Sequence, residues 1–444
     1  MPAKINSVIT HILVLLFLGA GFLLLLGTGQ AQGANWLMLQ GVEKPGAKTL
    51  NFNGFLMADY LDSGGGTLEA GPFKGQPMAK GLVGPGLNSS TEFNLRKMQG
   101  GLRGALSDAW GYSIRGVAGN NTATRGEYDN AVMLVEASLT WNTPAGVHVR
   151  IGMFKTLGSE ESLAFAPPGN YINLTNVTNM LVQERFSRAD GTSATHANNY
   201  VTCSCCRDSG IMLFDSIRYQ QWEFTYAAML GRGYGLGYSD PNSNPDLYLY
   251  LAAERLFNAG KGMWRRGWKI FGWSQQGERT LRIGNAQHKT DAARERYGFG
   301  TTVLWQRWRL NAEFVCASGM IFMASDGGAV PGAVSNDNSM VSSYNVFSDD
   351  RAYGWYVDGG YELLPGLWGC VRYDEVRFGT ETLAERELAS VTFGFQYFIT
   401  PAVQLKVNYE FRSGEARRQA EDSVTNQNME EMPDRFGAQV VWRF

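Results

Sequence analysis

The densest group of chemically reactive side chains is a cysteine cluster at 203–206, inside a long polar segment. Cys203 and Cys206 have the CxxC spacing that serves disulfides, thiol redox chemistry and metal binding. Arg207 follows where covalent haem attachment would need a histidine, so this is no c-type haem motif. A soft-metal site completed by His196 and a redox or partner-contact role remain open. Our prediction is a local disulfide between Cys203 and Cys206, without a metal or a cofactor.

No other spacing points to catalysis. The chain has four histidines and contains neither a His-Glu-x-x-His nor a Gly-x-Ser-x-Gly motif. The segment 240–246 places oxygen side chains at alternate positions, as a calcium loop does, but it lacks the required glycine and glutamate and carries two prolines. We interpret it as a polar surface loop. Lys+Arg 39 against Asp+Glu 41 gives no charge excess for nucleic acid. The sequence predicts a protein that is not an enzyme and binds no nucleic acid.

The N-terminus has the organisation of an export signal. Lys4 precedes an apolar run over 12–26, and small residues at 29–31 offer a cleavage site. We expect residues 1–31 to be removed and 32–48 to form a short periplasmic segment before the main domain at 49–444. A retained anchor helix is the alternative. No later apolar run is long enough for a membrane-spanning helix.

Two-residue periodicity dominates the rest of the chain, as in strands with one apolar and one polar face. In 130–141, one face holds Met133, Val135, Ala137, Leu139 and Trp141, and the other holds Glu136, Ser138 and Thr140. Reading the whole chain this way predicts sixteen strands, most of them long enough to cross a bilayer when tilted. Their spans are 49–60, 91–106, 110–119, 130–141, 147–156, 207–217, 221–231, 246–257, 267–278, 295–305, 308–320, 351–363, 367–377, 386–399, 403–412 and 434–444.

Short and long connections alternate between these strands. The long connections are 61–90, 157–206, 279–294, 321–350 and 413–433. Short periplasmic turns and long extracellular loops are typical of an antiparallel transmembrane β-barrel in the outer membrane of a Gram-negative bacterium. Tryptophans near the short turns or the C-terminus suggest an interfacial aromatic belt, whereas a secreted β-sandwich would bury both faces. The expected belt residues are Trp110, Trp141, Trp222, Trp268, Trp305, Trp308, Trp368 and Trp442.

Several segments, taken in order, resemble the bacterial porins and, within them, the phosphate-selective porin O/P-like family. These are 93–104, 149–156, 207–211, 393–401 and the terminal Trp442-Arg443-Phe444. The resemblance implies a homotrimer of sixteen-stranded pores in outer-membrane lipid. It also implies that the third long loop, here 157–206, folds inward as a constriction, and that Phe444 is the terminal aromatic used in membrane insertion.

Alternation also predicts which charged side chains enter the lumen. Lys97, Arg103, Arg115 and Arg150 lie on neighbouring strands, where they would concentrate anions. Acids and bases mix across the remaining wall, which could equally form an ordinary polar lumen with transverse charge pairs. The expected pore-lining residues are Lys97, Arg103, Arg115, Glu136, Arg150, Arg309, Glu313, Arg372, Lys406 and Glu410. The loop adds Glu160, Glu161, Glu184, Arg185 and Arg188, and its acids argue against strict phosphate selectivity.

The sequence therefore predicts an outer-membrane porin for passive diffusion of small ions or hydrophilic solutes, with a possible anion preference. The alternative is a barrel sheath that holds a multihaem cytochrome for electron transfer across the membrane. A sheath needs the loop 157–206 outside the bore, and a porin needs the loop inside it.

Overall fold

A computed structural model describes most of the chain. The described residues are 42–43, 46–63, 66–78, 91–119, 132–164, 169–186, 202–203, 206–233, 242–257, 265–283, 288–325, 328–330, 332–342, 344–380 and 382–444. The expected signal segment 1–31 and most of 32–48 lie outside this part of the chain, so both stay predictions.

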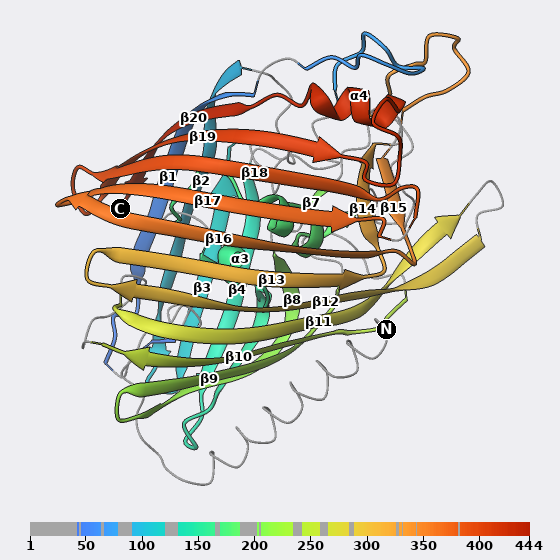
Figure 1. Cartoon of the computed structure of the whole chain (residues 1–444). Coiled ribbons are helices and arrows are strands. Elements are labelled where there is room, and N and C mark those ends of the chain that lie inside the picture. The colour runs from blue at the N-terminus through green and yellow to red at the C-terminus, as the bar shows by residue number, and fades with distance from the viewer. Residues whose placement is uncertain are drawn as a thin grey trace.

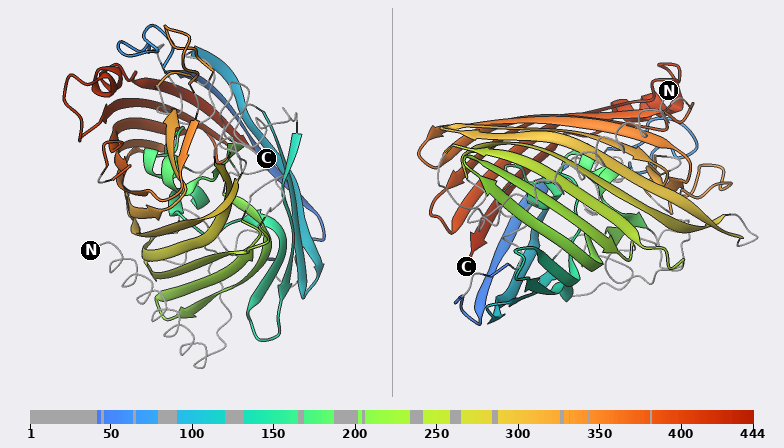
Figure 2. Two further views of the ribbon diagram at one scale, coloured as in Figure 1. Left: turned by 90° about the vertical axis from the view of Figure 1, so that its right-hand side faces the viewer. Right: turned by 90° about the horizontal axis from the view of Figure 1, so that it is seen from below.

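Sixteen antiparallel strands form one closed barrel, in which β5 pairs with β8 and β20 closes on β1 (Figures 1 and 2). The strands are β1 (Asn51–Asp62), β2 (Thr91–Ser107), β3 (Trp110–Ala118), β4 (Val132–Asn142), β5 (His148–Lys155), β8 (Arg207–Tyr219), β9 (Trp222–Gly231), β10 (Asp246–Leu256), β11 (Gly267–Ile283), β12 (His288–Trp305), β13 (Trp308–Ser318), β16 (Arg351–Leu364), β17 (Leu367–Phe378), β18 (Arg386–Phe398), β19 (Val403–Glu415) and β20 (Arg435–Arg443). The predicted architecture and strand count are confirmed.

The outer face of the barrel is apolar and the inner face is largely polar. On β18, Phe393 and Phe395 are 50% and 55% exposed, whereas the alternating Thr392 and Gln396 are buried. Closing the sheet leaves no unpaired edge, so the backbone groups of all sixteen strands find partners within the ring. This arrangement suits a hydrocarbon exterior and a hydrated interior.

The aromatic belt is present with one correction. Trp110, Trp141, Trp268, Trp305, Trp308 and Trp442 are all exposed on the outside, near the rim that carries the short turns. Trp368 is only 7% exposed and faces inward, where its ring lies 5.4 Å from the Arg309 guanidinium carbon. It shares the inner face of β17 with Cys370 and Arg372. Its assignment to the belt was therefore wrong, because nearness to a turn does not determine which face a side chain takes.

A bulge in β4 corrects the predicted faces of that strand. Arg115 pairs with Glu136, but the next residue, Gly116, pairs with Leu134, so β4 has one extra residue at this point. Such a bulge changes which face the following side chains take. Val135 is 1% exposed and lies inside with Glu136, instead of on the lipid-facing side.

The predicted long connection at 279–294 is also wrong. The β11–β12 ladder continues through Arg279↔Ala292 to Ile283↔His288, so the two strands run well beyond the predicted ends. The charged side chains in this stretch suggested a loop. Arg279 and Arg294 instead alternate with outward residues and face the lumen.

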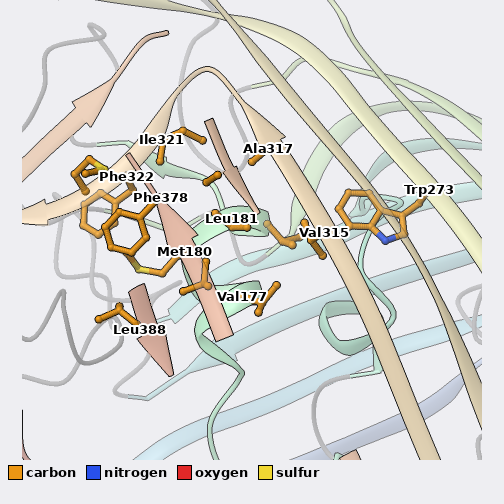
Figure 3. Close-up of a cluster of buried hydrophobic side chains, with 14 of the residues drawn as sticks. Val177, Met180, Leu181, Trp273, Val315, Ala317, Ile321, Phe322, Phe378 and Leu388 are labelled. Atoms are coloured by element: carbon orange, nitrogen blue, oxygen red, sulfur yellow. The ribbon is translucent and has the colours of Figure 1, made fainter. Parts of the chain in front are cut away.

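Smaller elements fill the barrel and its long-loop rim. The loop 157–206 contains α3 (Glu160–Ala164), η2 (Thr178–Val182), β6 (Arg185–Phe186) and β7 (Thr202–Cys203). The long-loop rim carries β14 (Ile321–Ser325), β15 (Tyr344–Phe347) and α4 (Val424–Glu430). Residues of η2 pack with β14 and with the ends of β17 and β18 in a buried apolar cluster (Figure 3). None of the described helices is long and apolar enough to cross a bilayer.

Candidate functional site

The described helical segments of the loop 157–206, α3 and η2, lie inside the barrel, within the ring of strands (Figure 2, left). Main-chain and amide groups of the loop bind inward-facing side chains of distant strands. The Ile172 N–H donates to Asn408 Oδ1 (2.6 Å), Asn173 Nδ2 donates to Glu410 Oε1 (2.8 Å) and the Asn176 N–H donates to Asp374 Oδ1 (2.7 Å). These bonds hold the loop against the wall formed by β17 and β19.

Glu313 on β13 is a second anchor for the loop. Its carboxylate accepts hydrogen bonds from Ser159 Oγ of the loop (2.9 Å), from Trp273 Nε1 (2.7 Å) and from Tyr356 Oη (2.8 Å). A buried carboxylate with three donors is well satisfied even without a cation. Glu313 therefore faces inward as expected, but it supports the loop and is covered by it.

The first two predicted loop carboxylates are both paired with wall cations. Glu160 forms an ion pair with Lys269 and accepts a hydrogen bond from Tyr250 Oη (3.0 Å). Glu161 accepts from Arg372 Nη1 at 3.2 Å. Both carboxylates therefore face the wall formed by β10, β11 and β17, and point away from the wall formed by β2 to β5.

Glu184 pairs with two wall cations. Its Oε2 lies 2.9 Å from Arg279 Nη2 and 3.0 Å from Arg294 Nε. Burial opposes ionisation of this carboxyl, but the two guanidinium groups outweigh it and hold the pKa of Glu184 below its usual range. Ion pairs thus hold the loop at α3 and again just after η2.

The opposite wall, on β2 to β5, carries the predicted basic residues. Lys97 lies 5.8 Å from the centroid of the Phe55 ring, and Arg103 Nε lies 2.6 Å from Glu43 Oε1. Arg115 donates to Asn53 Oδ1 at 2.9 Å and lies 3.5 Å from Glu136 Oε2. We call Lys97, Arg103, Arg115 and Arg150 the basic wall.

Arg150 is fully buried and lacks an ion pair within the described part of the chain. Its Nε donates to Thr140 Oγ1 at 3.2 Å, and its guanidinium carbon lies 4.6 Å from the centre of the Phe214 ring. The Nη1 and Nη2 atoms have no hydrogen-bond partner among the described residues. A buried cation of this kind costs stability, so its presence calls for a functional explanation.

Two further cations at the root of the loop were not predicted from the sequence. Lys155 ends β5 and Arg207 begins β8, and the two residues face each other in the ladder. Lys155 Nζ donates to the Leu163 carbonyl at 2.9 Å, so it binds the loop where the chain leaves the wall. The available signal was that both residues lie at strand ends next to the loop 157–206.

The remaining predicted lumen residues also face inward. Glu410 pairs with Arg435, whose Nε lies 2.9 Å from Glu410 Oε2. Arg309 lies under Trp368, and Lys406 is 1% exposed on β19. Whether all these residues line a conducting path stays a prediction, since several are covered by the loop.

Some predicted residues lie outside the described part of the chain. This applies to Arg188 and to the side chains of Arg185 and Cys203. Cys206 is half-buried against the main apolar cluster. The disulfide between Cys203 and Cys206 stays a prediction. Within the described residues, no group of three or more His, Cys, Asp or Glu side chains could hold a metal ion.

Solved structures with this fold include several outer-membrane proteins. The anion-selective porin of Comamonas acidovorans superimposes with a TM-score of 0.52 at 10% identity, covering 90% of this chain and 100% of that one. The outer membrane channel DcaP of Acinetobacter baumannii gives 0.51 at 12% identity, with 90% and 97% covered. OmpT of Vibrio cholerae in its trimer form gives 0.50 at 10%, with 89% and 99% covered. Identities this low establish a shared fold alone.

No protein-family model matches the chain. No curated protein matches it either. The finer resemblance to the phosphate-selective porins stays a prediction.

Proposed function

We propose that the protein is an outer-membrane porin through which small hydrophilic solutes and ions diffuse passively, with a preference for anions. It catalyses no reaction. The observation that carries this proposal is a closed barrel whose inserted loop is fixed against one wall while a basic wall faces it. The fold of the matched porins and channels supports the same conclusion.

The anion preference follows from where the charges are directed. The loop acids Glu160, Glu161 and Glu184 pair with wall cations on the side where the loop is held. On the basic wall, Glu136 and Glu43 offset part of the positive charge, and Arg150 forms no ion pair with a described residue. Clustered cations at a narrow aqueous passage raise the local concentration of anions.

The cytochrome sheath is disfavoured by the position of the loop. Described residues 169–184 occupy the space beside β17 to β19 that a haem polypeptide would need. An inserted loop is what the porin interpretation requires. The proposed location is the outer membrane, with apolar outer side chains in lipid. The proposed assembly is a homotrimer, which is supported by the trimer form of Vibrio cholerae OmpT among the matched structures.

Planar-bilayer recording tests the proposal directly. Purified protein should insert in discrete conductance steps, and the reversal potential in a KCl gradient should have the sign of chloride preference. A detergent-purified barrel that gives no steps, or that co-purifies with haem absorbance, would overturn the porin assignment. Steps with cation preference would overturn only the anion preference.

A further inference from the structure

The segment before β1 is held against the β2–β3 hairpin at the short-turn rim. The Gly46 N–H donates to Asp108 Oδ1 (3.1 Å), the Ala105 N–H donates to the Lys48 carbonyl (3.2 Å) and Tyr112 Oη donates to the Thr49 carbonyl (2.9 Å). These bonds join a non-strand segment to strands that carry the basic wall. They fix residues 46–49 beside the basic wall.

Glu43 reaches the basic wall from this segment. Its Oε1 lies 2.6 Å from Arg103 Nε, and its carbonyl oxygen lies 3.4 Å from Asn142 Nδ2 at the end of β4. The neighbouring Val42 packs against the main apolar cluster, whose members include inner-wall side chains of β5 and β8. The side chains of Arg103 and Glu43 keep 19% and 16% exposure, so water reaches both partners.

We propose that Glu43 is a selectivity-determining residue, a tethered counter-ion that the N-terminal segment supplies to the basic wall. This inference rests on the proposed porin function. Glu136, the other acid at this wall, belongs to a strand and cannot leave it. Glu43 lies on the segment before β1. Its carboxylate holds the position at Arg103 that a permeating anion would otherwise occupy. It therefore lowers the anion preference that the wall alone would give.

Charge-removing variants at Glu43 test the proposal. One carboxylate about 7 Å from the ion path, with screening over about 10 Å at 0.1 M salt, changes the anion-to-cation permeability ratio about threefold. Glu43→Gln should raise the ratio by about that factor, and Glu43→Lys should raise it further. Both variants should form channels, because the substitutions lie outside the barrel strands.

The matched control is Glu385→Gln, which removes a carboxylate from the Arg418–Glu385 pair at the long-loop rim. It should leave the ratio unchanged. Reversal potentials in a KCl gradient at low salt give the ratio for wild type and all three variants. An unchanged ratio in both Glu43 variants, or an equal change in the control, would overturn the role of Glu43. Wild-type protein without channels would instead overturn the porin function from which the inference starts.

Discussion

Arg150 offers the sharpest test of the basic wall, because its charge has no ion-pair partner among the described residues to obscure the result. Its two Nη groups are buried without hydrogen-bond acceptors, and its nearest described contacts are Thr140 and two phenylalanine rings. Arg150→Met removes the charge and keeps an unbranched chain of similar length. We therefore expect a change in ion selectivity without a loss of stability.

The magnitude follows from Coulomb's law. An ion in the passage, separated from the Arg150 guanidinium by one layer of atoms, comes within about 7 Å of it. At that distance the Coulomb energy between the two charges in water is about 0.6 kcal/mol. Salt at 0.1 M reduces this to about 0.3 kcal/mol. This Coulomb energy is favourable for chloride and unfavourable for potassium, so the energies of the two ions differ by about 0.6 kcal/mol. The anion-to-cation permeability ratio of Arg150→Met should therefore be about threefold lower than that of wild type. At 1 M salt the Debye length is about 3 Å and most of the difference should disappear.

The assay combines reversal potentials with thermal unfolding in detergent. Arg418→Met is the control, since that side chain is 50% exposed at the long-loop rim. Removing a buried charge that forms no ion pair with a described residue should leave the unfolding temperature of Arg150→Met equal to or above that of wild type. An unchanged permeability ratio would refute the claim that the basic wall borders the ion path. A clearly lower unfolding temperature would refute the claim that burying the Arg150 charge costs stability.

Three further predictions concern the scaffold. Glu313→Ala leaves three buried donors without an acceptor, at about 1–3 kcal/mol each, and should lower unfolding stability and increase open-channel current noise as the loop loosens. Arg435→Met leaves Glu410 buried and without this ion pair and should destabilise the barrel by about 3–5 kcal/mol in denaturant titrations, with partial rescue by Glu410→Gln. Brominated lipids should quench the fluorescence of a single-tryptophan variant that keeps Trp308, which is 57% exposed, but not of one that keeps the fully buried Trp273.

Much of the barrel could be predicted from the sequence because the two-residue period is a local signal. Alternation along the strands assigns Arg103, Arg115 and Arg150 to the inner face, and in the structure they contact Glu43, Asn53 and Thr140; that they line a conducting path stays a prediction. Assigning faces by alternation failed where the backbone departs from the two-residue period, as at the bulge at Val135. It also failed where polarity suggested a loop, since the β11–β12 ladder extends through charged residues as far as His288.

The partners of the loop acids could not be predicted in the same way. Glu160 pairs with Lys269, and Glu161 pairs with Arg372, across 109 and 211 positions of sequence. No local pattern encodes such a pairing, because it depends on how the loop enters the closed ring. From the sequence alone, these acids argue against strict phosphate selectivity, whereas their contacts direct their charge away from the basic wall.

The proposed ion preference therefore depends on where the loop lies. In a simple molecular sieve, a loosened constriction loop increases conductance and leaves selectivity nearly unchanged. Here the same loosening would also carry carboxylates such as Glu184 into the passage with the loop, while Arg279 and Arg294 stay on the barrel wall, where Arg279 keeps its pair with Asp246. Variants that widen the passage by releasing the loop should consequently lose anion preference as conductance rises. A released loop that raised conductance with the preference intact would mean that selectivity resides in the wall alone.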